Sequence, residues 1–165
     1  WFGEYFKYEK SPEYWLTDVS GIPFGMMSEM LQDGGNPYRG MLYGMTAREP
    51  MESIPSQLWK VWDAFGIKDS RMMGYWVSYN PVKTGRNDIL ATSFVKDGKV
   101  MIAIASWAKK DSDIKLQIDW EKLGIDADKA RLTAPDIKGF QEGFSLSPKD
   151  KIKVPKDKGF IFILE

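Results

Sequence analysis

Two apolar segments joined by Asp97-Gly98 constrain the fold of this chain more than any other feature. Residues 89–95 form one apolar run, and residues 100–107 are apolar at nearly every position. Asp-Gly favours a tight hairpin because glycine tolerates a positive φ. A strand that is apolar on both faces is typical of the centre of a sheet that is covered on each side. The sequence therefore predicts a central β-hairpin.

Other segments of the second half have the pattern of short strands. Residues 114–120 alternate strictly between apolar and polar side chains, which predicts a half-buried strand. Residues 151–154 and 159–164 supply two more strands, and residues 72–76 supply the first. Short strands joined by turns are typical of an antiparallel β-sandwich, which we expect over residues 69–165.

The first half of the chain has a different composition and a different order of elements. It holds all seven tyrosines and most of the methionines, and such a shift usually marks a domain boundary. Its predicted elements alternate between strand and helix, in the order strand 1–6, strand 14–20, helix 21–31, strand 40–46 and helix 53–65. This order fits the closing units of a β/α barrel. We therefore expect residues 1–68 to be an α/β segment that resembles the end of such a barrel.

The helix over residues 53–65 has the clearest periodicity. Its apolar side chains recur at spacings of three and four residues, at Leu58, Val61, Trp62 and Phe65. Gly66 follows the last of them, where glycine commonly ends a helix. We expect this face to be buried.

The absence of cysteine and histidine limits the chemistry of the chain. It excludes thiolate nucleophiles, disulfides, Ser–His relays and histidine metal sites, so acid–base chemistry falls to carboxylates, Lys or Tyr. The sequence indicates no metal and no cofactor. The net charge is zero and no segment approaches ~20 apolar residues, so we expect neither nucleic acid nor a membrane as a partner.

Two carboxylates lie at the ends of predicted barrel strands, where functional side chains of such barrels project. Glu4 follows Trp1-Phe2-Gly3, and Asp18 closes the second strand. A pair of carboxylates beside aromatic residues is the equipment of a glycosidase. Glu4 and Asp18 are the candidate catalytic residues. The alternatives are a strand-end charge paired with a Lys or Arg for Glu4, and a turn or cap residue for Asp18.

Five residues are candidates for binding the substrate. Trp1, Tyr5 and Trp76 offer aromatic faces to a sugar, and the guanidinium groups of Arg39 and Arg48 can orient a hydroxyl or a carboxylate. Structural pairing with nearby carboxylates is the alternative for both arginines.

Several motifs resemble one protein family. Residues 20–25, 39–46, 58–67 and 105–107 are similar to the C-terminal part of large bacterial glycoside-hydrolase-like proteins of the kind common in Bacteroidetes. In that family a β/α barrel precedes a C-terminal β-sandwich. The resemblance implies a carbohydrate substrate and a secreted or periplasmic location, and it supports Glu4 because the Trp-Phe-Gly-Glu segment recurs there.

Three hypotheses follow for the function. The first is the C-terminal portion of a glycoside hydrolase that acts on a polysaccharide or oligosaccharide and is inactive without the rest of its barrel. The others are a carbohydrate-binding module and a structural accessory domain. Beside carbohydrate, we expect as partner the N-terminal part of the same protein or a second copy of the chain.

Overall fold

The computed structural model describes residues 11–13, 36–44 and 55–165. Residues 12 and 13 are helical. The other helices in these ranges are α2 (Pro37–Met41), α3 (Pro55–Phe65) and α4 (Trp120–Leu123), with a 3-10 turn η2 (Ile67–Asp69) after α3. The strands are β1 (Arg71–Met73), β2 (Val82–Lys83), β3 (Ile89–Lys96), β4 (Lys99–Ser106), β5 (Ser112–Ile114), β6 (Gln117–Ile118), β7 (Leu132–Ala134), β8 (Phe144–Leu146), β9 (Ile152–Val154) and β10 (Gly159–Leu164). The predicted elements at 1–6, 14–20 and 21–31 lie outside the described residues.

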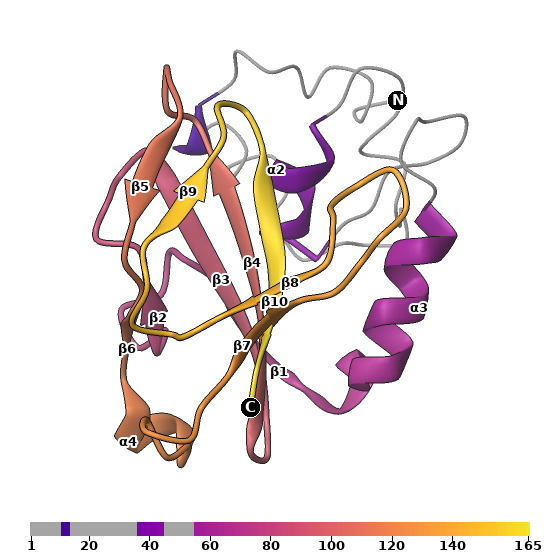
Figure 1. The fold of residues 1–165 in the computed structure, drawn as a ribbon, viewed down its shortest axis with the longest axis vertical. Coiled ribbons are helices and arrows are strands. Elements are labelled where there is room, and N and C mark those ends of the chain that lie inside the picture. Colours follow the sequence, from indigo (N-terminus) through magenta and orange to yellow (C-terminus); the bar gives the residue numbers. More distant parts are fainter. Residues whose placement is uncertain (1–10, 14–35, 45–54) are drawn as a thin grey trace.

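A six-stranded antiparallel sheet organises the described part of the chain (Figure 1). Its strand order is β1-β3-β4-β10-β7-β8, and two small ribbons, β2-β6 and β5-β9, lie beside it. The predicted fold class, mainly β with antiparallel sheets and few helices, is confirmed.

The predicted hairpin forms the centre of this sheet. β3 pairs with β4 from Ile89↔Ser106 to Lys96↔Lys99, and Gly98 in the turn has a φ of 71°. On its other side β4 pairs with β10 over six residues. The prediction of a central strand that is covered on both faces is therefore confirmed for β4.

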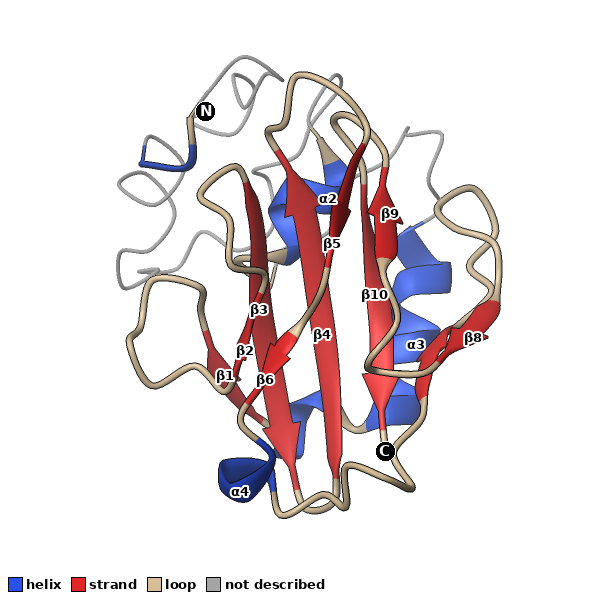
Figure 2. Cartoon of the chain, turned by 60° about the vertical axis from the view of Figure 1, so that its left-hand side comes forward, coloured by secondary structure: helices blue, strands red, loops and turns tan. Residues whose placement is uncertain are grey.

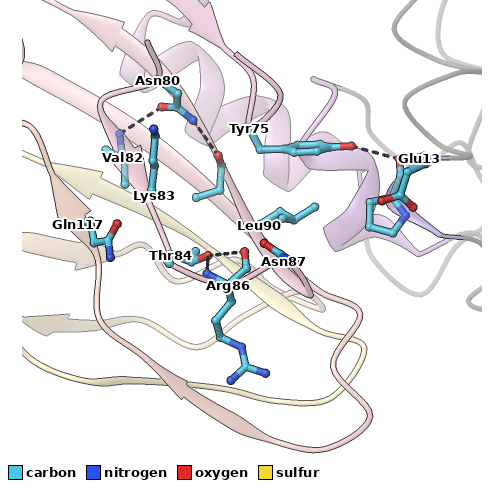
Figure 3. Close-up of a pocket in the computed structure, with 13 residues that line it drawn as sticks. Glu13, Tyr75, Asn80, Val82, Lys83, Thr84, Arg86, Asn87, Leu90 and Gln117 are labelled. Atoms are coloured by element: carbon cyan, nitrogen blue, oxygen red, sulfur yellow. Dashed lines mark hydrogen bonds between the residues drawn. The ribbon is translucent and has the colours of Figure 1, made fainter. Parts of the chain in front are cut away.

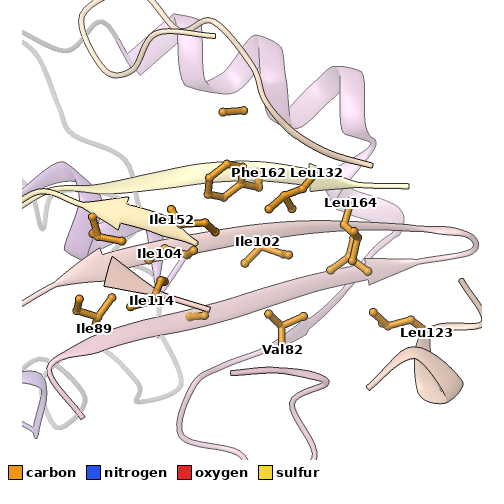
Figure 4. Close-up of a cluster of buried hydrophobic side chains, with 14 of the residues drawn as sticks. Val82, Ile89, Ile102, Ile104, Ile114, Leu123, Leu132, Ile152, Phe162 and Leu164 are labelled. Carbon is orange, nitrogen blue, oxygen red and sulfur yellow. The ribbon is translucent and has the colours of Figure 1, made fainter. Parts of the chain in front are cut away.

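The two faces of the sheet are buried by different elements. One face packs against the small ribbons through an aliphatic and phenylalanine core that contains Ile89, Ile102, Ile104, Phe162 and Leu164 (Figure 4). The opposite face is covered by helices. Figure 2 shows β5 and β6 in front of the large sheet and α2 and α3 behind it.

On the face of the sheet that the helices cover, α3 buries the apolar side chains that its sequence pattern predicts. Leu58 and Phe65 are buried in the second core, with Val61 and Trp62 partly buried beside them. Gly66 has a φ of 77° and its N–H donates to Trp62 O at 2.9 Å, which ends the helix. The predicted amphipathic helix is confirmed, with Pro55 as its first residue.

The prediction of a strand over residues 40–46 is wrong in its described part. Residues 37–41 form α2, and the chain turns at residues 42–44. The Asn36 side chain accepts hydrogen bonds from Tyr38 N and Arg39 N, and Pro37 is compatible with the first turn of a helix. The Asn36 cap therefore stabilises a helix in a segment whose composition is typical of a strand. Residues 45 and 46 lie outside the described ranges.

Two other predicted strands are shorter than expected. The single strand expected at residues 114–120 is divided: Ile114 ends β5, and residues 117–118 form β6. Asp119 then caps a helical turn by accepting from Lys122 N at 3.2 Å, so Trp120 begins α4. The strand expected at residues 72–76 ends at Met73, because the chain turns at Gly74.

Gly159 allows β10 to lie close to β4. A Cβ atom at this position would lie 1.7 Å from Ile104 O on the neighbouring strand. We expect Gly159→Ala to lower the free energy of unfolding by about 3 kcal/mol or more, the upper end of overpacking costs, because backbone atoms of the central strands must move. Urea unfolding followed by tryptophan fluorescence measures this loss.

Gly98→Ala is the matched control for Gly159→Ala. Its Cβ atom meets no atom within 4 Å, so it carries only the ~1–2 kcal/mol cost of a positive φ. Equal or smaller destabilisation by Gly159→Ala would contradict the close approach of the two strands.

Candidate functional site

The structure describes two of the seven predicted site residues. Glu4, Asp18, Trp1, Tyr5 and Arg48 lie outside the described residues, so their roles stay predictions. Arg39 lies on α2, and Trp76 follows β1.

Arg39 is inserted between α2 and the sheet. Its side chain is 1% exposed, and its Nη2 atom lies 2.8 Å from Asp157 Oδ1. The Nε and Nη2 groups also donate to Ser106 O, at 3.2 and 3.0 Å. The guanidinium carbon lies 4.6 Å from the centre of the Trp107 ring. This arrangement supports the structural alternative for Arg39, whose partner is Asp157, while a role in substrate binding stays a prediction.

Asp157 binds two residues of the α2 segment, Asn36 and Arg39. Its backbone φ of 56° makes it the one described non-glycine residue with a positive φ, a conformation that Asp tolerates better than most residues. While its carboxylate faces Arg39, its carbonyl accepts from Asn36 Nδ2 at 2.7 Å. The turn between β9 and β10 therefore binds both the cap and the middle of α2.

Residues at both ends of α2 also form hydrogen bonds with distant segments of the chain. Thr92 Oγ1 on β3 donates to Leu42 O at 2.8 Å, and Tyr38 Oη donates to Phe140 O at 2.7 Å. Met41 and Leu42 are fully buried in the core beneath the sheet. Residues 36–44 and the sheet are therefore one packed unit.

Two tyrosines meet at the edge of this unit. The hydroxyl oxygens of Tyr43 and Tyr75 are 2.9 Å apart, and both lie within hydrogen-bond distance of Pro12 O. Burial raises the pKa of Tyr43 strongly, and its hydrogen bond with Tyr75 adds to that shift. Burial also raises the pKa of Tyr75. Both phenols are therefore held in the neutral form.

This pair predicts a loss of stability in alkali. The unfolded tyrosines lose their protons near the ordinary pKa of about 10, whereas the folded phenols keep theirs, so the free energy of unfolding falls as the pH rises above about 10. Urea unfolding at a series of pH values measures the slope. We expect Tyr43→Phe to flatten it, while Tyr79→Phe, at an exposed ring, serves as the control. An unchanged slope in Tyr43→Phe would contradict this origin of the pH dependence.

Trp76 belongs to an aromatic cluster with the same two tyrosines. Its ring stacks on Tyr43, with centroids 5.7 Å apart and 12° between the planes, and it contacts the edge of Tyr75. Trp76 is 38% exposed. Part of its surface is therefore open to solvent, and its role in sugar binding stays a prediction.

A cavity of about 510 Å³ lies next to this cluster (Figure 3). One side is formed by Pro12 and Glu13 and the other by the loop over residues 80–87, with Gln117 of β6 at its rim. The lining combines charged, amide and apolar side chains. Such a mixture is suited to a ligand with both polar and apolar surface.

The described ranges contain no group of three or more metal-ligating side chains. Among the helices in the described part of the chain, none is long and apolar enough to cross a membrane.

Two family models match the sequence over adjacent ranges. Residues 1–50 match the TIM-barrel domain of glycoside hydrolase 123, and residues 54–165 match its C-terminal domain. No curated protein matches the sequence significantly. The two matches define a glycoside hydrolase, in which a TIM barrel is followed by a β-domain. Because the C-terminal-domain match covers more than half of it, the chain belongs to the glycoside hydrolase 123 family.

The family matches confirm the resemblance noted in the sequence. They also show that α2 and the sheet it packs against fall in two different domain matches. α2 and Pro12 belong to the barrel-domain match, whereas the sheet belongs to the C-terminal domain. α3 also falls in the C-terminal-domain match. The boundary expected between residues 68 and 69 from the order of the predicted elements stays a prediction.

Sequence reasoning missed Asp157 and the tyrosine pair. Asp157 lies 118 residues from Arg39 in a short Lys-Asp-Lys turn, which carries no motif. The Tyr43–Tyr75 contact likewise joins distant segments. The one local signal was the Asn36-Pro37 cap, which indicates a helix at the position of Arg39.

Proposed function

We propose that the chain is the C-terminal portion of a glycoside hydrolase that cleaves a polysaccharide or oligosaccharide, with Glu4 and Asp18 as its catalytic carboxylates. Membership of the glycoside hydrolase 123 family is the observation that carries this proposal. Both carboxylates fall in the part that matches the TIM barrel, where strand ends carry catalytic residues. One carboxyl group protonates the leaving oxygen, and the other acts as nucleophile or base.

The described domain acts as a support for that barrel. It buries Arg39, Met41 and Leu42 of the barrel-domain match against β4 and β10. A catalytic constellation needs its surroundings fixed closely, since small displacements of catalytic groups lower rates strongly. By holding residues 36–44, the sheet fixes a segment of the barrel-domain match. We therefore propose that the C-terminal domain supports the barrel that carries the hydrolase activity.

Trp1, Tyr5, Arg48 and Trp76 are the proposed contacts to the sugar. Arg39 contributes from inside the interface, where it orients α2. We also propose a secreted or periplasmic location, since polymeric carbohydrate substrates lie outside the cytoplasm.

A comparison of two proteins tests this proposal. The chain of residues 1–165 and a protein that carries the same chain behind a complete barrel are incubated with a panel of aryl glycosides, and release of the aryl alcohol is followed. We expect hydrolysis by the protein with the complete barrel and none by residues 1–165 alone. Failure of the complete protein to cleave any glycoside in the panel, or equal activity of both proteins, would contradict the proposal.

A further inference from the structure

The cavity beside the tyrosine pair is lined by polar and apolar residues, none of which is a proposed catalytic residue. Its volume of about 510 Å³ falls within the ~300–1,000 Å³ of small-molecule sites. It lies where Pro12 and Glu13, from the barrel-domain match, meet the loop over residues 80–87 of the C-terminal domain. A ligand there contacts both family domains.

The wall of the cavity is fixed by buried hydrogen bonds. Asn80 Nδ2 donates to Ala91 O at 2.9 Å, and Asn80 Oδ1 accepts from Val82 N and Ser93 Oγ at 3.2 and 2.7 Å. Thr84 Oγ1 donates to Ile89 O and accepts from Arg86 N. The buried side chains of Asn80 and Thr84 therefore hold the loop in shape before any ligand binds, which lowers the entropic cost of binding.

Three polar side chains on this fixed frame are available to a ligand. Lys83, Asn87 and Gln117 are exposed, and none makes a side-chain hydrogen bond or ion pair within the described part of the chain. The Nε2 atom of Gln117 lies beside Gly85, where a Cβ atom would be 2.9 Å from it. Figure 3 shows Gln117 across the loop from Asn87.

The charges around the cavity favour a neutral ligand. Of the two cations in the lining, Arg86 has its guanidinium bound by both oxygens of Asp88, at 2.8 Å each, so Lys83 is the one cation there without an ion pair in the described part of the chain. A phosphate or polyanion site needs an excess of cations with open donors. Two amide side chains instead offer both donors and acceptors, which suits hydroxyl groups.

The rest of the lining is apolar and suits the hydrocarbon face of a sugar ring. Leu90 and the Tyr75 ring, both partly buried, contribute this surface. We propose that the cavity is an accessory glycan-binding site, in which Asn87 and Gln117 bind hydroxyl groups of a neutral oligosaccharide. The choice of carbohydrate rests on the proposed function, while the presence of a preformed neutral site rests on the geometry alone.

Binding to immobilised oligosaccharides tests this site. Residues 1–165 are applied to a panel of neutral and sulfated oligosaccharides, and affinities are measured for the glycans retained. We expect binding to at least one neutral glycan, weakened about tenfold by Asn87→Ala and by Gln117→Ala, since each removes about one hydrogen bond. Gln57→Ala, an amide on α3 outside the cavity, is the matched control.

Hydrolysis measured in parallel separates this inference from the proposed function. In the protein with the complete barrel, Asn87→Ala should leave cleavage of a small aryl glycoside unchanged, because the residues that line the cavity include neither Glu4 nor Asp18. Hydrolysis without glycan binding by residues 1–165, binding that is insensitive to both amide variants, or a preference for sulfated glycans would overturn the inference and leave the hydrolase intact. Amide-dependent glycan binding without any hydrolysis would support the cavity and contradict the enzyme.

Discussion

Replacing Glu4 with Gln in the protein that carries the complete barrel is expected to lower kcat on aryl glycosides by about 10²- to 10⁴-fold, the contribution of a general acid or base. Glutamine keeps the size and much of the hydrogen bonding of glutamate, but it neither transfers a proton nor attacks the sugar. The loss therefore reports the chemistry of the carboxyl group and little of its packing.

Two substrates with different leaving groups identify the role of Glu4. If Glu4 is the acid, the loss is larger for an aryl alcohol of high pKa, which needs protonation to leave, than for one of low pKa. Asp18→Asn should then lower both rates similarly, as a nucleophile or base does. Glu121→Gln, at an exposed position of the C-terminal domain, is the control. Wild-type kcat in Glu4→Gln would remove Glu4 from the mechanism.

Replacing Arg39 with Met is expected to lower the free energy of unfolding of residues 1–165 by about 3–5 kcal/mol. Methionine fills much of the volume of the arginine stem, but it leaves Ser106 O and the Asp157 carboxylate without their described guanidinium partner. Asp157 is 32% exposed, so solvent compensates part of the loss on that side. The free energy of unfolding of Arg39→Lys should lie between those of the wild type and Arg39→Met, because lysine keeps the charge and loses the fork of donors.

Arg86→Met is the matched control, since Arg86 pairs with Asp88 at the surface, where both side chains are exposed. An exposed pair contributes about 0–1 kcal/mol, so this variant should unfold near the wild-type urea concentration. A double-mutant cycle of Arg39→Met with Asp157→Asn, which keeps a residue that tolerates positive φ, isolates the ion pair. Equal destabilisation by the Arg39 and Arg86 variants would contradict the structural role of Arg39.

The elements that the sequence predicted well have their signals within a short window. The Asp97-Gly98 turn and the flanking apolar runs are contiguous, and the apolar face of α3 repeats within three turns. Burial of β4 on both faces is visible in its own composition. Short-range patterns of this kind specify an element before its partners are known.

The elements that were predicted wrongly depend on distant partners or on single cap residues. Residues 40–46 have a strand-like composition, yet Asn36 caps a helix there and Asp157, far along the chain, stabilises it. Asp119 interrupts a strictly alternating segment in the same way. The partner of Arg39 follows from topology alone, since the nearer carboxylates were equally reasonable from the sequence.

In the candidate site too, local sequence indicated some residues, and others depend on contacts between distant segments. Glu4 and Asp18 were singled out because barrels place catalytic groups at strand ends, and that reasoning needs only local sequence. The tyrosine pair and the polar cavity are assembled from residues 11–13, 36–44 and 75–117, so no local pattern indicates them.

The central claim is that the barrel-derived residues 36–44 and the C-terminal sheet form one cooperative unit, and native-state hydrogen exchange tests it most directly. The amides of Gly40, Tyr43 and Gly44 donate to carbonyls within this segment, and those of β4 and β10 donate across the sheet. We predict that both groups exchange only through global unfolding, with the same free energy and the same dependence on denaturant. Exchange of the residue 36–44 amides at a free energy several kcal/mol below that of β4 would contradict the claim.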